Sequence, residues 1–362
     1  LIWYSQEARS YALMVLFAAL ALVGFARSIR APSKGSLGLW ALASALALCS
    51  HYFAVFLVAP QAAWLIWVLR PRRPAIVATV AVGIAGLALA PYAASQEGSS
   101  RRNGFTNIPL ATRAGETALD FVASEEPDPL AGTASIDAIQ IGSAALAGML
   151  FLLAAALALS GADDAERVGA IAIGSVALAS IAVPLAFAAA GLDFITPRNL
   201  IGAVVPLVVV AAIGFGARPS GRVGLAAALG GLLLFCGVDA AVYASAQMQR
   251  PDWRGAAQAI GPARAPRILV VNHNGDDPLD YYLGSAKLTK RNAPKPGVRE
   301  VVALGSGPPP RPPGSGFRLA TERRIPPFTL TVFRASSRVR IARPALEHVL
   351  QERDSLLVQR PR

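Results

Sequence analysis

The chain has 362 residues, of which 54% are hydrophobic and only 15% are charged. About a quarter of the residues of a soluble domain are charged, whereas here the apolar residues gather into nearly uncharged runs of bilayer length, about 20 residues. The composition excludes a purely soluble enzyme, a disordered chain and a disulfide scaffold, and predicts a polytopic α-helical membrane protein. The net charge of +12 includes no basic stretch interleaved with aromatic residues, so nucleic acid is not an expected partner.

The first part of the chain, residues 1–244, is expected to form about eight transmembrane helices embedded in a lipid bilayer. At about 1.5 Å per residue each run is long enough to cross with little tilt. Within a bilayer a helix satisfies every backbone polar group internally. The expected spans are Tyr11–Ala26, Leu37–Phe53, Val55–Leu69, Ala75–Tyr92, Ile141–Ser160, Val168–Ala190, Leu200–Gly216 and Val223–Tyr243.

Basic residues lie in alternate loops between the expected spans, which assigns those loops to the cytoplasmic side. The outer side then carries both chain ends, the corner at His51, the outer loop 93–140 and the corner before Leu200. The loop of Asp163, Asp164, Glu166 and Arg167 falls on the cytoplasmic side. The basic loop residues are Arg27, Arg30, Lys34, Arg70, Arg72, Arg73, Arg218 and Arg222.

After residue 244 the composition changes to Arg, Pro and short alternating runs. This change predicts a small extracytoplasmic α/β domain over residues 245–362, which is long enough to hold a core. Gly305–Gly316 is expected to be a loop or hinge. The expected elements are helices at Asp252–Ile260 and Ala345–Val358, and strands at Arg267–Val271, Glu300–Leu304 and Phe328–Arg334.

Candidate site residues occur at three places on the expected outer side. Glu7 and Arg9 precede the first span beside Tyr11; two residues apart, they project together in an extended chain but not on a helix. An aromatic belt with a snorkelling Arg and a first-turn Glu explains the same pattern equally well. The two interpretations stay open at this point.

The second place is His51 with Tyr52, and the third is Arg198. A His at the membrane edge is a candidate for binding a phosphate or a sugar hydroxyl, although a structural role of such an interfacial pair is the more common one. Pro197 suits a first helical turn, where backbone amides and Arg198 can hold a phosphate together. Interface anchoring is the alternative for Arg198.

Other chemistry-bearing residues give weaker signals. Asp239 is costly inside a span unless it meets a partner or water. Cys49 and Cys236 lie in apolar runs and suggest no metal. The turn Asn272–Asp277 lacks the spacing of a calcium loop. No Walker loop, GxSxG or HExxH motif is present. The outer-loop acids, expected to be solvated, are Glu116, Asp120, Glu125, Glu126, Asp128 and Asp137.

Five short segments, taken in order, resemble bacterial membrane glycosyltransferases of the GT-C class, the group of glycosyltransferase family 39 that is related to protein O-mannosyltransferases and to the aminoarabinose transferase of lipid A. Residues 4–13, YSQEARSYAL, resemble the YSQEARxYAL signature, which is fairly specific. His51–Phe53 resembles the tHYf helix end, and Pro197–Leu200 the RYL element, although Asn199 replaces the usual aromatic residue. Arg250–Arg254 and Pro278–Leu283 resemble the DWR and YYL elements. The resemblance runs from Leu1 to about Phe333.

The resemblance implies transfer of a sugar from a polyprenyl-phosphate carrier to a protein, lipid or glycan acceptor, at the outer face of the bacterial cytoplasmic (inner) membrane. Because family members carry the catalytic acid in the first outer loop, the general base is expected upstream of Leu1, in a chain truncated at its N-terminus. A divalent metal is compatible with the chemistry, but these residues predict no metal site. The resemblance assigns donor and phosphate binding to Glu7, Arg9, Tyr11, His51, Tyr52 and Arg198.

The chemistry of such a transfer suits these side chains. Attack on the anomeric carbon develops negative charge on the departing lipid phosphate, which preorganised Arg side chains stabilise best in a dry cavity. A carboxylate would accept the proton of the acceptor hydroxyl. A transporter or flippase of a lipid-linked glycan is the alternative; it predicts an inverted repeat and charges near the bilayer midplane, for which only Asp239 is a candidate. A membrane-anchored binding protein leaves the clustering of candidate residues unexplained.

Overall fold

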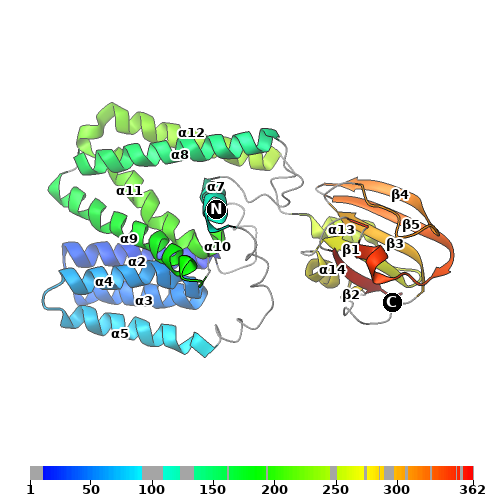
Figure 1. Cartoon of the computed structure of the whole chain (residues 1–362). Helices are drawn as coiled ribbons and strands as arrows, with labels where there is room; N and C mark the ends of the chain where they lie inside the picture. The colour runs from blue at the N-terminus through cyan, green and yellow to red at the C-terminus, as the bar shows by residue number, and fades with distance from the viewer. Residues whose placement is uncertain are drawn as a thin grey trace. The chain divides into compact units, whose positions relative to one another are not determined.

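The computed structural model describes residues 11–91, 109–122, 134–160, 163–192, 195–244, 251–272, 275–284, 286–288, 297–305, 309–326, 328–347, 349–350 and 354–361. The chain divides into two compact units (Figure 1). One unit comprises Leu1–Glu125 and Asp137–Ala240 and contains most of the helices from α2 to α12. The other comprises Glu126–Ile136 and Ala241–Arg362 and contains a mixed sheet with short helices.

The first unit is a bundle of apolar helices joined by short turns, most of which run side by side (Figure 1). Its elements are α2 (Tyr11–Arg30), α3 (Lys34–Ser50), η1 (Tyr52–Ala54), α4 (Val55–Val68), α5 (Arg73–Ala88), α7 (Leu110–Val122), α8 (Ala134–Ser160), α9 (Asp164–Ala189), α10 (Pro197–Leu200), η3 (Ile201–Ala203), α11 (Val204–Gly216), η4 (Arg218–Ser220) and α12 (Gly221–Ala244).

Five helical segments of this unit are long and apolar enough to cross a membrane: Tyr11–Arg30, Gln140–Ser160, Asp164–Ala189, Pro197–Gly216 and Arg218–Ala244. Three apolar helices are shorter, Lys34–Ser50, Tyr52–Val68 and Arg73–Ala88. The chain is therefore a largely helical, membrane-associated protein of the multi-pass type. Helices lie at all eight expected positions, but three are too short to count as spans by length alone, so the number eight stays a prediction.

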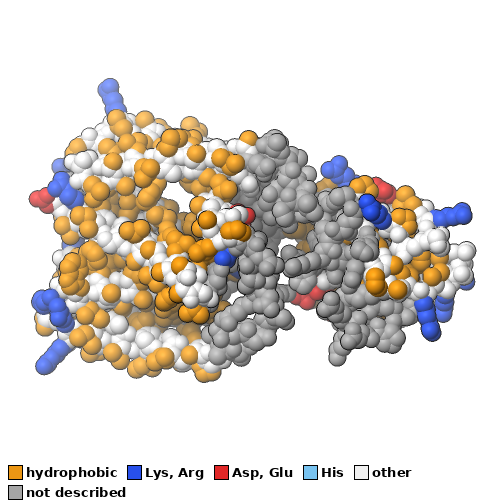
Figure 2. Space-filling view, viewed as in Figure 1, with side chains coloured by type: hydrophobic (Ala, Val, Ile, Leu, Met, Phe, Trp, Pro, Cys, Tyr) orange, Lys and Arg blue, Asp and Glu red, His pale blue; other side chains and the backbone are white. Residues whose placement is uncertain are grey.

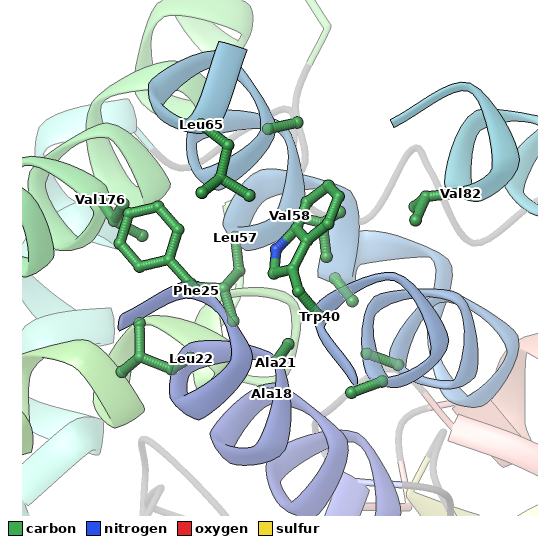
Figure 3. Packing of buried hydrophobic residues seen from close by; sticks show 14 of the residues in the cluster. Ala18, Ala21, Leu22, Phe25, Trp40, Leu57, Val58, Leu65, Val82 and Val176 are labelled. Atoms are coloured by element: carbon green, nitrogen blue, oxygen red, sulfur yellow. The ribbon is translucent and has the colours of Figure 1, made fainter. Parts of the chain in front are cut away.

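The bundle core is centred on α2, α3 and α4. Trp40 of α3 and Phe25 of α2 are fully buried. In Figure 3 the indole of Trp40 lies beside Leu57 and Val58 of α4, and the ring of Phe25 points toward Val176 of α9. The indole Nε1 of Trp40 donates a 2.9 Å hydrogen bond to Oε1 of the buried Gln61. This interhelical bond satisfies a polar group that lipid or an apolar core would leave unpaired.

A close approach of two backbones makes this packing possible. A Cβ atom at Gly24 of α2 would lie 2.5 Å from the backbone nitrogen of Trp40 and 2.7 Å from its Cα. Only glycine permits this separation, as in other helix pairs that approach through small residues. The close spacing of α2 and α3 therefore depends on the absence of a side chain at Gly24, where the backbone of Trp40 approaches.

Most of the described basic side chains of the first unit gather at one end of the bundle (Figure 2), and Arg113 and Arg198 are the exceptions among them. The turns between α2 and α3, α4 and α5, and α11 and α12 all carry basic side chains. The opposite end contains the start of α2, the α3–η1 corner and α10. The bundle thus has one strongly basic end and one end with few charges among its described residues.

The helix boundaries differ from the expected ones at two corners. The second span was expected to run to Phe53, but α3 ends at Ser50, and His51 adopts an extended conformation that redirects the chain into η1. The seventh span was expected to be continuous, but α10 gives way to the 3₁₀ turn Ile201–Ala203, where Gly202 packs against Met14. Hydropathy does not reveal the second break, because Ile201, Gly202 and Ala203 are as apolar as the helix.

The second unit is a six-stranded sheet of order β2-β6-β1-β3-β5-β4, in which only β1 and β3 pair in parallel. Its elements are α13 (Trp253–Ile260), β1 (Arg267–Asn272), α14 (Asp276–Leu283), β2 (Ala286–Leu288), β3 (Val298–Gly305), β4 (Phe317–Ile325), β5 (Phe328–Val339), α15 (Arg343–Glu347) and β6 (Asp354–Gln359).

Alternation along β1 builds one core on each face of the sheet. Leu269 and Val271 pack with α13 and α14, whereas Ile268 and Val270 pack with α15 and the residues after it. Two buried clusters follow, as expected for a strand whose side chains point alternately to opposite faces.

A charged network crosses the sheet at the start of β1. Arg267, only 8% exposed, binds Glu300 at 2.7 Å and donates hydrogen bonds to the backbone oxygens of Ile260 and Gly261. Glu300 also accepts a 3.1 Å bond from Arg334. Burial raises the pKa of Glu300, but the hydrogen bonds and charges of the two arginines outweigh this effect and hold its pKa below the ordinary value.

The expected elements of the tail are largely confirmed, with one error. Helix α13 and strands β1, β3 and β5 lie at the predicted positions. The helix predicted over Ala345–Val358 is wrong: helix α15 ends at Glu347, and Asp354–Gln359 forms β6 between β1 and β2. Leu356 and Leu357 are both buried because the two faces of the sheet are each covered, so the strand carries no period-2 signal.

Candidate functional site

The end of the bundle opposite the basic turns contains a cluster of aromatic rings. The ring of Tyr11, at the start of α2, lies 5.3 Å from the ring of His51. His51 in turn lies 5.6 Å from the rings of both Tyr52 and Phe53. Further contacts extend the cluster through Phe56 to α9. The short interruption of the helices at His51 brings these rings together, because it folds η1 back against the end of α3.

Arg198 lies at the same end, on α10, which packs against both η1 and η3. Its side chain is exposed and forms no ion pair within the described ranges. The sequence predicted that the N-terminal amides of a long helix starting at Pro197 would add to the positive charge of Arg198. Helix α10, however, has only four residues before the chain continues as the 3₁₀ turn η3. Arg198 itself is therefore the source of positive charge here.

Arg198 lies close enough to His51 for its charge to influence the imidazole. Burial first, and the charge of Arg198 second, lower the pKa of His51 to about 4. His51 belongs to neither flanking helix; it is the corner residue between α3 and η1. Its imidazole is therefore neutral at neutral pH, when one ring nitrogen donates a hydrogen bond and the other accepts one.

Two polar atoms at this end are buried without a hydrogen-bond partner in the described part of the chain. They are Nδ1 of His51 and Oγ1 of Thr196, the residue that precedes α10 and whose side chain does not cap it. Leaving such an atom unpaired costs about 1–3 kcal/mol. Buried polar atoms normally have a protein or water partner, so an unpaired one in a native structure calls for an explanation. Both atoms therefore lack, among the described residues, the partner that a buried polar atom normally has.

Sequence reasoning missed the helix that packs on α10. Residues 110–122 were taken as part of a polar loop, but they form α7, which contacts α10. Arg113 and Thr117, one turn apart, are its buried residues, at 7% and 5% exposure, whereas Glu116 is exposed. Their spacing of four residues was the available signal, since positions i and i+4 share a helix face.

The predicted site residues therefore separate into three groups. Tyr11, His51 and Arg198 come from three distant parts of the sequence and lie at one end of the bundle. Tyr52 lies beside them but is 38% exposed. Glu7 and Arg9 lie outside the described residues. Asp239 lies near the end of α12 and is partly exposed, and among the described residues no three His, Cys, Asp or Glu side chains gather as metal ligands would.

The arrangement suits an anionic group joined to a hydroxyl-rich one. A guanidinium binds phosphate by charge-assisted hydrogen bonds. The neutral imidazole and the threonine hydroxyl can exchange hydrogen bonds with hydroxyl groups, and the aromatic rings offer apolar surface beside them. The chain matches no protein-family model, no curated protein and no solved structure.

Proposed function

We propose that this protein is a membrane glycosyltransferase that takes a sugar from a polyprenyl-phosphate donor and transfers it to a protein, lipid or glycan acceptor at the outer face of a bacterial cytoplasmic membrane. The observation that carries the proposal is the meeting of Tyr11, His51 and Arg198 at one end of an apolar bundle. The resemblance of residues 4–13 to the YSQEARxYAL signature supports the same function.

In the proposed role, Arg198 binds the phosphate of the donor and stabilises the negative charge that develops on it as the glycosidic bond breaks. Such stabilisation is strong where water is excluded. His51 and Thr196 bind hydroxyl groups of the sugar or phosphate oxygens through their unpaired buried atoms. The proposal assigns no general base to the described residues.

The proposed topology has eight spans, with the basic turns in the cytoplasm and the candidate site outside. The short helices α3, α4 and α5 are then completed by their flanking residues or by local thinning of the bilayer, each at modest cost. The basic turns support this orientation, because Lys and Arg are enriched in cytoplasmic loops. The α/β unit lies outside in this topology.

The test is sugar transfer by the full-length protein in lipid nanodiscs, with synthetic polyprenyl-phosphate sugars as donors. Arg198→Ala is expected to lower kcat/KM about 100-fold, the usual effect of removing one donor to developing charge. Arg222→Ala is the matched control, because Arg222 is an exposed arginine at the opposite, basic end of the bundle. The control is expected to stay within about twofold of the wild type.

Two outcomes contradict the proposal. Equal turnover by the wild type and Arg198→Ala removes Arg198 from the site. Movement of the lipid-linked sugar between leaflets, without transfer to any acceptor, instead identifies a flippase, the alternative that the sequence left open. His51→Gln and His51→Ala extend the test, since only the glutamine variant keeps a hydrogen-bonding group at that corner.

A further inference from the structure

The β4–β5 hairpin of the second unit is unusually rich in arginine. Between Phe317 and Arg340 it carries six exposed arginines and a single acidic residue, Glu322. We call the six arginines the arginine ribbon: Arg318, Arg323, Arg324, Arg334, Arg338 and Arg340. Blue side chains project from the surface over β4 and β5 in Figure 2.

The strand register concentrates part of this charge on one face. Arg318 is directly opposite Arg334, and Arg323 is directly opposite Leu330. Positions 334 and 330 are four apart on β5, so both lie on the same side of the sheet. Arg318, Arg323 and Arg334 therefore share one face of the hairpin.

The ribbon is not neutralised by the protein. Arg334 binds Glu300, but the other five arginines form no ion pair within the described residues. Like charges directly opposite each other on neighbouring strands are destabilising, and Arg318 faces Arg334. An external polyanion would remove this repulsion.

The acids of α14 lie away from the ribbon, whereas exposed arginines also occur elsewhere in the unit, at Arg254, Arg264 and Arg360. The order β2-β6-β1-β3-β5-β4 puts the ribbon at the β4 edge. The acids of α14, Asp276, Asp277 and Asp280, lie toward the other edge, because α14 packs on β2 and β6.

We propose that the arginine ribbon docks the α/β unit onto the surface of an anionic phospholipid bilayer. The unit continues from the end of the apolar helix α12, so its local concentration at a membrane is high without any other contact. Each arginine close to an anionic surface raises the docking equilibrium about fivefold. This proposal rests on membrane association and not on the proposed glycosyltransferase activity.

Edge strands also carry arginine or lysine to prevent pairing with other sheets, and an acidic protein is the other occupant that the charge would suit. A dependence on anionic lipid distinguishes docking on a bilayer from both of these alternatives.

The test uses the full chain in nanodiscs of phosphatidylcholine, with or without phosphatidylglycerol. A fluorophore is attached at Ser337→Cys, beside the ribbon, after the exposed Cys49 and Cys236 are replaced by alanine.

In anionic nanodiscs the fluorophore is expected to be protected from quenching by aqueous iodide. This protection is expected to vanish in neutral nanodiscs, and also in about 1 M salt, where the Debye length falls to about 3 Å. Arg318→Gln/Arg323→Gln is expected to weaken docking about 30-fold. The matched control is Arg254→Gln/Arg264→Gln, which removes two exposed arginines from and just after α13 and is expected to keep the protection.

Hydrogen exchange of β4 in the unlabelled chain provides a second readout and shows whether each variant keeps its sheet. Equal protection in neutral and anionic nanodiscs, or an equal loss in both arginine pairs, overturns the proposal. Protection that requires added polyglutamate, and is absent with phosphatidylglycerol, overturns it in favour of an acidic protein partner.

Discussion

Replacing Gly24 by alanine tests whether the packing of α2 on α3 positions the candidate site. The new Cβ would lie 2.5 Å from the backbone nitrogen of Trp40, whereas ordinary contact begins at 3.4 Å. The two helices must then separate by about 1 Å, because the atoms in the way are backbone atoms that cannot rotate aside.

Overpacking of a tight core costs about 1–3 kcal/mol, and the rigid neighbour puts Gly24→Ala at about 3 kcal/mol. For a unit of this size such a loss lowers Tm by about 6–12 °C. The site is affected as well, although Tyr11 lies about 20 Å along α2 from Gly24. A splayed α2–α3 pair changes the 5.3 Å separation of the Tyr11 and His51 rings.

Thermal unfolding in nanodiscs and binding of a polyprenyl-phosphate sugar measure the two effects. Gly38→Ala is the matched control, because Gly38 is exposed on α3 and no heavy atom lies within 4 Å of the added Cβ. Alanine there favours the helix by up to about 1 kcal/mol, so Tm is expected to stay or rise. If Gly24→Ala unfolds at the wild-type temperature, the close approach at Trp40 is not what holds the bundle together.

Three other changes have defined outcomes. Trp40→Phe is expected to destabilise the bundle by about 1–3 kcal/mol, because the buried Gln61 loses its hydrogen-bond donor. The double variant Trp40→Phe/Gln61→Leu is expected to recover part of this loss in the same thermal unfolding measurement. Because the pKa of Glu300 is lowered, its ionised form stabilises the folded sheet at pH values above the ordinary pKa of 4.5, and this stabilisation is lost as the pH falls through the folded-state pKa. Hydrogen exchange of β1 is therefore expected to differ between the wild type and Glu300→Gln at pH 7 and to become equal in acid. Asp252→Ala removes the side chain that accepts a 2.8 Å hydrogen bond from the Gly255 amide. It is expected to lower the free energy of opening of α13, measured by hydrogen exchange, by about 1 kcal/mol, whereas Asp252→Asn is expected to leave it unchanged.

The helical part of the fold could be predicted because the signal lies in local composition. A run such as residues 11–30 is apolar throughout and carries basic residues at its end, so its type and approximate limits follow from the sequence. The break at Ile201–Ala203 could not be predicted. It depends on Gly202 meeting Met14 from another helix, and no local pattern records that contact.

The sheet illustrates the same limit. β1 and β3 were predicted because each contains a continuous buried run. β4 was not predicted, because every residue after Phe317 is exposed or only partly buried and the strand shows no alternation of apolar and polar residues. Its place is set by β5, to which it pairs along almost its whole length. β6 was mistaken for a helix because both its faces are covered.

For the site, the sequence indicated which residues were unusual but not which of them meet. Thr196 was noted only as the residue before Pro197 and was given no role, and Arg113 drew no attention because an arginine in a polar loop is common. The burial of Arg113 and of the Thr196 hydroxyl oxygen becomes apparent only in the folded bundle, where α7 packs on α10. Conversely, Asp239 stood out in the sequence as a charge in a span, yet it lies near the end of α12, where water or headgroups can solvate it.

The burial of the interfacial aromatic residues bears on the belt interpretation, which the sequence left open for Tyr11 and favoured for the His51–Tyr52 pair. A belt residue turns its ring toward the headgroups, and Tyr52, at 38% exposure, fits that description. Tyr11 does not, because it is only 4% exposed and its ring lies against His51 inside the end of the bundle. A purely structural His51 would have both ring nitrogens satisfied or solvated, whereas its Nδ1 is buried and lacks a partner among the described residues. Together with the charge of Arg198 near the same ring, these features are the ones that support the proposed binding site at this corner.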